Sequence, residues 1–267
     1  MLRVAISGVS GRMGNVLVHA LAEAEDMSLG AAFENSKDGS VGCDAGEVAG
    51  VAKIGVIVSD SPLEKLDDFD VVIDFSVPEA TMSLVEICQD HCKAMVIGTT
   101  GFNDSQLAAL RGYSKNIPIF VSPNMSLGVN ILFKLVSEAA AAFGDDVDYE
   151  IMEAHHSRKI DAPSGTAARL GEILANNLSR DVKSCGVYGR QGNVGERSKK
   201  EIGFSSIRGG DIVGDHTVFF VGEGERIEIT HRAQSRSNFA QGALRATRFL
   251  SNQENGFFDM EQLLELS

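Results

Sequence analysis

The chain has 267 residues, 43% of them hydrophobic, so it is long enough to bury the core of one large domain or of two modest ones. Its formal net charge of −13 disfavours nucleic acids and anionic membranes as partners, because both carry negative charge themselves. No stretch approaches the roughly 18 consecutive apolar residues of a transmembrane helix, which excludes a membrane-spanning protein of that type.

The first residues and the cysteines predict a cytoplasmic protein. Residues 1–6 read as a strand and lack the charged and apolar regions of a secretory signal peptide. The four cysteines form no paired framework, and a reducing compartment would keep them as thiols. Cys88 and Cys92 flank His91 like part of a metal site, but no second cysteine pair completes it, so we expect ordinary packing and no metal.

The first 125 residues alternate between strand-like and helix-like segments. In chain order we expect a strand at 2–6, a helix at 11–24, strands at 27–33, 54–58 and 71–75, a helix at 79–88, a strand at 94–97, a helix at 105–111 and a strand at 117–121. The apolar run that begins at Val71 is typical of a strand covered on both faces. This alternation predicts an α/β fold whose N-terminal domain, residues 1–126, is a Rossmann-type, doubly wound parallel sheet.

The pattern changes after residue 124. We expect a helix at 129–143, a strand at 148–153, a helix at 164–178, a polar and mobile loop at 189–200, an antiparallel hairpin of strands 216–221 and 226–230, and a helix at 239–250. These elements predict a second, α+β domain over residues 127–236. The tail, 237–267, is predicted to be helical and to pack back on the first domain.

A glycine-rich loop lies directly between the first expected strand and the first expected helix. Gly8, Gly11 and Gly14 are spaced three apart, which allows a sharp turn, close approach of a pyrophosphate to bare amides, and tight packing of the helix on the sheet. Structural turns use glycine too, but the position after a strand and before a helix favours dinucleotide binding.

The ends of three later strands extend this interpretation. Glu34 ends the second expected strand, twenty residues past Gly14, where a carboxylate can accept both ribose hydroxyls of NAD. The alternative is a solvated loop acid, and the glycine loop favours the ribose role. Two later strands end in small or hydroxyl residues. Because the carboxyl ends of parallel strands border the ligand crevice, we expect the segment 98–100 at the nicotinamide.

The most informative stretch follows the strand at 148–153. Four basic side chains fall within five residues there: His155, His156, Arg158 and Lys159. A few residues later, the Ser-Gly-Thr of 164–166 opens a helix, whose free amides can bind an anion and whose glycine admits a carboxylate close to the backbone. A surface loop without a task and a simple helix N-cap are the alternatives. Local positive charge on an acidic protein nevertheless predicts a substrate with more than one carboxylate.

These motifs occur together in one known family. The chain resembles the 4-hydroxy-tetrahydrodipicolinate reductases, also called dihydrodipicolinate reductases. The matching segments run nearly end to end: Gly8-Val-Ser-Gly-Arg-Met-Gly14, Gly98-Thr-Thr-Gly-Phe102, Asn124-Met-Ser-Leu-Gly-Val-Asn130, Glu153-Ala-His-His156, Lys159-Ile-Asp-Ala-Pro-Ser-Gly-Thr166 and Gly210-Asp-Ile-Val-Gly-Asp-His216. The stretch from the histidines to the threonine is highly specific, whereas the glycine loop is not.

The resemblance implies an NAD(P)H-dependent oxidoreductase that reduces 4-hydroxy-tetrahydrodipicolinate in lysine and diaminopimelate biosynthesis. It implies a mixed-sheet second domain that binds the substrate and assembles a homotetramer. The cofactor would be held by Gly8, Val9, Ser10, Gly11, Arg12, Met13, Glu34, Gly98, Thr99, Thr100, Ser122, Pro123, Asn124 and Met125. His155 would donate or accept a proton and Lys159 would donate one. The substrate carboxylates would be bound by His156, Gly165 and Thr166.

One departure from the family concerns the cofactor. Relatives that use NADPH well often carry an arginine directly after the ribose acid, but this chain has the neutral Asn35. Glu34 would also repel a 2′-phosphate. Lys37 or Arg12 could compensate, and we expect NADH to be used at least as well as NADPH.

Two other functions stay open on the residues alone. Another two-domain dehydrogenase of an anionic substrate would share the glycine loop, but it would not need His155 and Lys159 beside a carboxylate-binding helix end. A non-catalytic NAD sensor would require a basic helix-turn-helix or an exposed partner helix, and neither pattern is present. The expected partner is therefore a small dicarboxylate rather than nucleic acid or a membrane.

Overall fold

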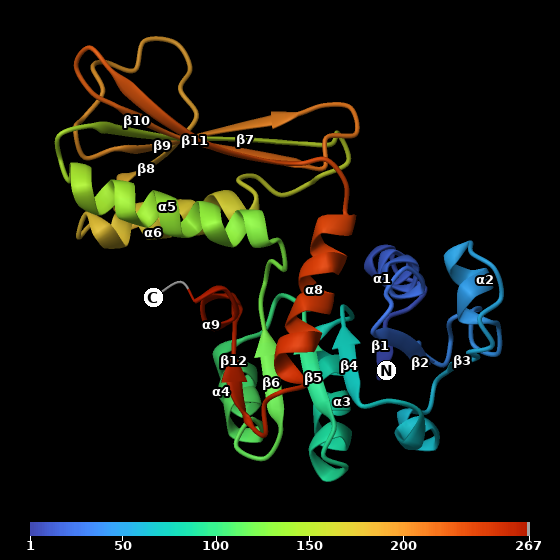
Figure 1. Cartoon of the computed structure of the whole chain (residues 1–267). Coiled ribbons are helices and arrows are strands. Elements are labelled where there is room, and N and C mark those ends of the chain that lie inside the picture. Colours follow the sequence, from blue (N-terminus) through green and yellow to red (C-terminus); the bar gives the residue numbers. More distant parts are fainter. Residues whose placement is uncertain (266–267) are drawn as a thin grey trace. The chain divides into compact units, whose positions relative to one another are not determined.

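The computed structural model describes residues 1–265 and separates them into two compact units (Figure 1). Unit 1 comprises residues 1–127 together with the C-terminal part of the chain from Arg236 onward, and unit 2 comprises residues 128–235. No helix within residues 1–265 is both long and apolar enough to cross a membrane. The chain thus leaves unit 1 once and later returns to it.

Unit 1 is built on a sheet of seven strands that all run parallel. Their order across the sheet is β12 (Gly256–Phe258), β6 (Pro118–Val121), β5 (Ala94–Ile97), β4 (Val71–Asp74), β1 (Leu2–Ser7), β2 (Met27–Phe33) and β3 (Val58–Ser59). The chain builds outward from β1 on one side through β2 and then on the other through β4. Ligands bind at such a reversal, beyond the carboxyl ends of the strands. The predicted Rossmann-type sheet is confirmed.

Helices cover both faces of this sheet. α1 (Arg12–Ala22) and α8 (Ser237–Leu250) share one core with it, and α3 (Pro78–Asp90) and α4 (Asp104–Tyr113) share a second core on the opposite face. Along β4, Val71 and Ile73 enter the first core and Val72 enters the second. All three are buried, as the apolar run predicted. The remaining elements are α2 (Ala45–Ala49), the 3-10 helix η1 (Pro62–Asp68) and α9 (Met260–Leu264).

Two expectations for unit 1 are corrected by the structure. The C-terminal tail is not purely helical, because β12 lies between α8 and α9 and pairs with β6. A strand of three residues is too short to show an alternation of apolar and polar residues in the sequence. The segment becomes a strand only because β6 offers it a free edge. The strand expected at 54–58 shrinks to Val58–Ser59. Gly55 has a φ of +82°, and the N–H groups of Ile54 and Gly55 donate to the Asp44 carboxylate instead of to a neighbouring strand.

Unit 2 is a five-stranded mixed sheet with two helices on one face (Figure 1). The strand order is β11 (Arg226–Ala233), β10 (Gly214–Val221), β7 (Asp148–His155), β9 (Ile202–Arg208) and β8 (Gly186–Tyr188). β10 is antiparallel to both β7 and β11, whereas β9 is parallel to β7 and β8. The predicted mixed sheet and the β10–β11 hairpin are confirmed, and β8 and β9 were missed.

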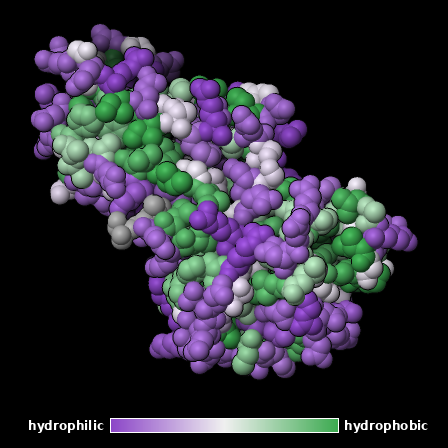
Figure 2. All heavy atoms as spheres, viewed as in Figure 1, coloured by the Kyte–Doolittle hydropathy of each residue, from purple (hydrophilic) through white to green (hydrophobic). Residues whose placement is uncertain are grey.

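α5 (Leu127–Phe143) and α6 (Gly165–Asn177) cover the apolar face of this sheet, and α7 (Val182–Cys185) precedes β8. Hydrophobic atoms gather over α5 in Figure 2, where Ile131 and Leu135 are exposed. The stretch 189–200 forms no helix or strand. Arg190 and Arg197 within it bind the carboxylate of Glu150 on the face of β7 away from the helices.

The helix-covered face of β7 changes from apolar to polar along the strand. Tyr149 and Ile151 are buried in the core with α5 and α6, and the next two positions on that face are Glu153 and His155. In the neighbouring strand β10, His216 lies directly opposite Glu153. The sheet register therefore gathers polar side chains at the end of β7, beside the start of α6.

Candidate active site

The glycine loop of unit 1 has the backbone geometry of a phosphate loop. Gly8 has a φ of +80°, a region that favours glycine, and its N–H donates to the carbonyl of Phe33 at 3.0 Å. A Cβ on Gly14 would lie 2.3 Å from the carbonyl oxygen of Gly8, so only glycine lets α1 pack this close to the loop. Gly11 is exposed and is the N-cap of α1, with no side-chain cap. The first turn of α1 therefore presents backbone amides that can bind an anion.

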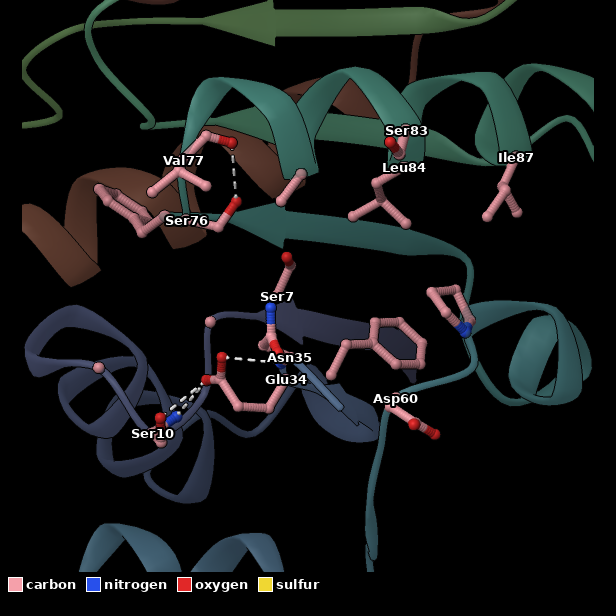
Figure 3. A pocket seen from close by; sticks show the side chains of 16 residues that line it. Ser7, Ser10, Glu34, Asn35, Asp60, Ser76, Val77, Ser83, Leu84 and Ile87 are labelled. Atoms are coloured by element: carbon pink, nitrogen blue, oxygen red, sulfur yellow. Dashed lines mark hydrogen bonds between the residues drawn. The ribbon is translucent and has the colours of Figure 1, made fainter. Parts of the chain in front are cut away.

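Glu34 lies against this loop (Figure 3). Its Oε2 accepts hydrogen bonds from the backbone N–H of Ser10 at 3.1 Å and from the Ser10 hydroxyl at 2.8 Å, and its Oε1 accepts from the N–H of Asn35 at 3.0 Å. Hydrogen bonds to one carboxylate thus join the end of β2 to the glycine loop. Val9 beside Ser10 is fully buried, Arg12 is exposed, and Met13 is half-buried against the core.

A cavity of about 530 Å³ opens next to these residues. Gly8, Ser10, Gly11, Glu34 and Asn35 form part of its wall. The opposite wall was missed from the sequence and includes the apolar side chains of Val77, Leu84 and Ile87 at the start and along one face of α3 (Figure 3). Pro62 of η1 and Ala80 of α3 also line the cavity. Ala80, Leu84 and Ile87 have the spacing of a single helix face. This spacing is the sequence signal from which they could have been predicted.

The other predicted cofactor residues lie outside the lining of this cavity. The buried Thr99 hydroxyl donates to Oδ2 of Asp74 at 3.1 Å and accepts from the N–H of Ser76 at 3.0 Å. Gly98 packs against the ring of Phe75, where a Cβ would approach to 2.2 Å, and Thr100 is exposed. These contacts tie the end of β5 to the end of β4.

The segment 122–125 forms a tight turn after β6. The buried Ser122 hydroxyl donates to the carbonyl of Asn124 at 2.8 Å, while Pro123 is exposed and Asn124 half-buried. Met125 is buried in the core, and its carbonyl lies so close to Gly242 of α8 that a Cβ there would approach to 1.7 Å. Only Pro123 and Asn124 of this segment expose much of their side chains.

In unit 2, the carboxylate of Glu153 binds several donors at the start of the predicted catalytic segment. Its side chain is 1% exposed, and Arg208 of β9 binds both oxygens, Nη1 to Oε2 at 2.8 Å and Nη2 to Oε1 at 2.7 Å. The N–H of Ser164 donates to Oε1 at 3.2 Å. Burial by itself raises the pKa of Glu153, but hydrogen bonds from Arg208, Ser206 and His155 outweigh it and lower this pKa to about 2. Glu153 is therefore ionised at neutral pH.

His155 and His216 lie beside this carboxylate. Nδ1 of His155 is 2.6 Å from Oε2 of Glu153, and its ring meets that of His216 edge to face with centroids 5.2 Å apart. Nε2 of His216 is 2.9 Å from the hydroxyl of Ser164. Burial, reinforced by electrostatic repulsion from the nearby His155, lowers the pKa of His216 to about 3, so the His216 ring is neutral at neutral pH.

Lys159 follows in a turn closed by the hydrogen bond from its N–H to the carbonyl of His156 at 3.1 Å. Its ammonium donates to both carboxylate oxygens of Asp161, at 2.8 and 2.7 Å, and the hydrogen bond from Lys159 lowers the pKa of Asp161. His156 is half-buried, and its N–H donates to the carbonyl of Ile212 at 2.8 Å. Nη2 of Arg208 also donates to the carbonyl of Asp161 at 2.7 Å. Arg208 thus joins Glu153 to the segment that carries Lys159.

The start of α6 completes the arrangement in unit 2. Ser164 is the N-cap, and its hydroxyl accepts from the N–H of Ala167 at 3.2 Å. Gly165 is exposed, with open space where a Cβ would be, and Thr166 is half-buried in the first turn. The structure thus brings His155, Lys159 and the first turn of α6 together through Glu153 and Arg208. Among residues 1–265, no group of three or more His, Cys, Asp or Glu side chains is placed to hold a metal ion.

Comparison with known proteins assigns the chain to a family. Residues 2–125 match the family model described as "Dihydrodipicolinate reductase, N-terminus", and residues 128–264 match "Dihydrodipicolinate reductase, C-terminus". The chain belongs to the dihydrodipicolinate reductase family. The predicted resemblance is confirmed, and with it the predicted class of enzyme, an NAD(P)H-dependent oxidoreductase.

Individual members of the family match along the whole chain. The 4-hydroxy-tetrahydrodipicolinate reductase of Chromohalobacter salexigens is 51% identical over 267 residues, covering 100% of this chain and 99% of the relative. That of Hahella chejuensis is 52% identical over 266 residues, covering 100% of both. Among solved structures, a dipicolinate-bound dihydrodipicolinate reductase from Paenisporosarcina sp. TG-14 is 28% identical, with a TM-score of 0.76 and 97% of each chain covered.

More distant structures share the fold alone. A probable dehydrogenase from Thermotoga maritima is 14% identical with a TM-score of 0.63, covering 99% of this chain and 93% of its own. Similarity of fold alone therefore does not single out this family.

Sequence reasoning missed three of the polar residues gathered at the end of β7: Glu153, Arg208 and His216. Glu153 and His216 stand inside the motifs quoted for the family, but nothing in their spacing assigns them a role. Arg208 belongs to β9, a strand that the sequence did not reveal. Its pairing with Glu153 depends on the parallel register of β7 and β9, in which His155 lies opposite Arg208.

Proposed function

We propose that this chain reduces 4-hydroxy-tetrahydrodipicolinate to tetrahydrodipicolinate with a reduced nicotinamide dinucleotide, a step of lysine and diaminopimelate biosynthesis. The observation that carries the proposal is the cluster of His155, Lys159 and the first turn of α6, with its exposed Gly165, in a chain that matches reductases of this substrate from end to end. The solved relative bound to dipicolinate, a flat dicarboxylate, supports the same substrate class.

Unit 1 has the features that a dinucleotide requires. The left-handed Gly8, the exposed N-cap Gly11 and the adjoining cavity suit a pyrophosphate, a ribose and an adenine ring. We therefore assign the pyrophosphate to the loop 8–13 and the ribose hydroxyls to Glu34, with the apolar wall along α3 for the base. The segments 98–100 and 122–125 are assigned to the nicotinamide on the family resemblance.

The lining of the cavity supports the use of NADH. Among the described residues that form it, Glu34 and Asp60 carry negative charge and none is Lys, Arg or His. A 2′-phosphate beside Glu34 would meet repulsion without a compensating cation in that wall. Neither Lys37 nor Arg12 belongs to the lining. NADH is accordingly expected to serve at least as well as NADPH.

The proposed reaction begins when the substrate ring loses water to give a conjugated imine. When bound, the reduced nicotinamide supplies a hydride to the ring carbon and is oxidised as the imine is reduced. The electron pair displaced to the ring nitrogen or enamine then takes a proton from the Lys159 ammonium. Before this transfer, the Asp161 carboxylate holds the ammonium in place through two hydrogen bonds. His155 is the second residue of the cluster that can donate or accept a proton, and the cationic segment stabilises the negative charge that develops.

The carboxylates of the substrate are assigned to the start of α6. Gly165 leaves open space in front of the helix, and the amides of the first turn together with the helix dipole attract an anion there. Thr166 in the same turn and His156 supply further side-chain donors. These two groups and Gly165 are the substrate-binding residues of the proposal.

We also infer a homotetramer and a cytoplasmic location, both from the family resemblance. The face of the unit 2 sheet away from the helices exposes Ile207 and Val221, which supports self-association through that face. Analytical ultracentrifugation tests the oligomer, with a single species of four chains as the expected result.

The activity is tested by generating the substrate from pyruvate and aspartate semialdehyde and then following oxidation of NADH and, separately, of NADPH. Rapid consumption that depends on both the substrate and the protein is the expected outcome. A folded protein that binds NADH without consuming it would return the case to an NAD sensor or to a dehydrogenase of another substrate.

A further inference from the structure

The carboxylate of Glu153 is shared by three parts of unit 2 that the proposed reaction uses. It accepts hydrogen bonds from the ring of His155, from the guanidinium of Arg208 and from the backbone of Ser164 at the start of α6. With 1% of the side chain exposed, water has almost no access to replace any of these donors. The orientation of the His155 ring therefore depends on a residue that makes no contribution of its own to the proposed proton transfers.

The bond between Glu153 and His155 also decides which ring nitrogen holds the proton. An ionised carboxylate only accepts hydrogen bonds, and Glu153 is ionised at neutral pH. Nδ1 of His155, 2.6 Å from Oε2, must be the donor. In the neutral ring Nε2 is then left with its lone pair. No residue in the described range 1–265 forms a hydrogen bond with Nε2.

A glycine makes room for Nε2. A Cβ on Gly214 at the start of β10 would lie 3.0 Å from Nε2 of His155, closer than ordinary contact. His216, two residues further along the same strand, packs its ring against that of His155. The motif at 210–216 thus borders the ring at both of these positions, a role that its sequence did not suggest.

We infer that Glu153, held by Arg208, is the positioning residue for His155, fixing the proton on Nδ1 so that Nε2 is the atom that exchanges a proton with the substrate. The inference rests on the proposed function, because it takes His155 as a proton-exchanging group. When Nε2 takes a proton, the ring becomes an imidazolium, and the adjacent carboxylate stabilises that charge. When Nε2 gives the proton up, the hydrogen bond at Nδ1 keeps the ring in place for the next cycle.

The first test is made on the wild-type protein and needs no turnover. With ¹⁵N-labelled histidine, long-range ¹H–¹⁵N spectra recorded at a pH where the ring is neutral distinguish the two tautomers of His155 among the six histidines of the chain. We expect Nδ1 to be protonated and Nε2 to be unprotonated. A neutral His155 that carries its proton on Nε2 overturns the inference.

The second test compares two substitutions on the same strand. Glu153→Gln removes the charge and makes either tautomer of His155 acceptable, so we expect kcat to fall by about 10- to 100-fold, a share of the ~10²–10⁴-fold that positioned proton transfer contributes. The KM for NADH should stay within about twofold, because the proposed cofactor residues belong to unit 1. Glu150→Gln is the matched control. It alters another arginine-paired carboxylate of β7, on the opposite face, and should leave kcat unchanged.

Wild-type kcat in a folded Glu153→Gln protein, or an equal loss in the two variants, contradicts the inference. Gly214→Ala covers the case in which Glu153→Gln does not fold, because it leaves the Glu153–Arg208 pair intact and crowds Nε2. We expect a lower kcat with the Nδ1–H signal retained, and an unchanged kcat would exclude Nε2 as the exchanging atom. A wild-type protein that shows the expected tautomer but turns over no substrate would refute the proposed function and not the positioning of the ring.

Discussion

Arg208 lies opposite His155 in the register of β7 and β9, yet its guanidinium binds Glu153, two residues along, through hydrogen bonds of 2.7 and 2.8 Å. Nη1 of Arg208 and Nδ1 of His155 both contact Oε2 of this carboxylate, so the positive charge of the arginine and the His155 ring share one oxygen. The same guanidinium donates to the carbonyl of Asp161, whose side chain holds Lys159. One arginine therefore organises both residues that the proposed chemistry needs.

Replacing Arg208 with Met is expected to destabilise unit 2 strongly. The change would leave the buried Glu153 carboxylate without its charge partner, and we expect the free energy of unfolding to fall by about 3 kcal/mol. This value is at the lower end for buried ion pairs, because the arginine side chain is 21% exposed. Urea unfolding followed by circular dichroism measures it. Arg169→Met, which removes an exposed pair with Glu172 on α6, should change the free energy of unfolding by less than about 1 kcal/mol.

Lys159→Met tests the proposed proton donor. Loss of the ammonium should lower kcat by about 10²–10⁴-fold, the usual contribution of a positioned proton donor, without weakening NADH binding. Steady-state kinetics and a fluorescence titration with NADH separate the two effects. Lys183→Met, at an exposed lysine of α7, is the control and should retain full activity. Equal activity in the two variants would remove Lys159 from the mechanism.

Asn35→Arg tests the interpretation of cofactor choice. Asn35 lines the cavity beside Glu34, where an arginine could offset the carboxylate and bind a 2′-phosphate in bidentate fashion. We expect kcat/KM for NADPH to rise about tenfold relative to that for NADH, which corresponds to roughly 1.4 kcal/mol. Kinetics with both cofactors measure the ratio. A wild-type protein that already prefers NADPH strongly would show that the negative lining does not decide the choice.

Gly14→Ala tests the close packing of α1 on the glycine loop. The new Cβ would lie 2.3 Å from the carbonyl of Gly8, so the helix must shift, at a cost of about 1–3 kcal/mol and with weaker binding of NADH. Gly112 on α4 is the matched control, because nothing lies within 4 Å of its added Cβ. Gly112→Ala should raise stability by about 0.5–1 kcal/mol through helix propensity. Thermal melts of both variants give the comparison.

Acid should destabilise the protein in two stages. The pKa of His216 is lowered from 6.5 to about 3, so the unfolded chain binds the extra proton first and stability falls as the pH drops below about 6.5. The pKa of Glu153 is lowered from 4.5 to about 2, and its contribution, complete above pH 4.5, is lost between these two values. His216→Gln should therefore flatten the upper stage and leave the lower one. Urea midpoints measured across this pH range test the order.

The sequence by itself determined the parallel sheet of unit 1 and the location of the segment that we propose to be catalytic. A glycine triplet between a strand and a helix, and apolar runs such as that of β4, are local signals, because each reflects the needs of a few neighbouring residues. The same holds for the cationic residues between His155 and Lys159 and for the cap at Ser164. Such signals sufficed to predict the Rossmann-type sheet and the family.

Tertiary structure alone decided the pairings between distant segments. β9 and β12 became strands because β7 and β6 offered edges to them, and neither has a strong period of its own. The fold brings α3 and η1 beside the end of β2, where they form the apolar wall of the cavity. Glu153 meets Arg208 across a sequence separation of 55 residues. A carboxylate can be recognised in a sequence, but its hydrogen-bond donors, its burial and so its charge state depend on which strands the fold places beside it.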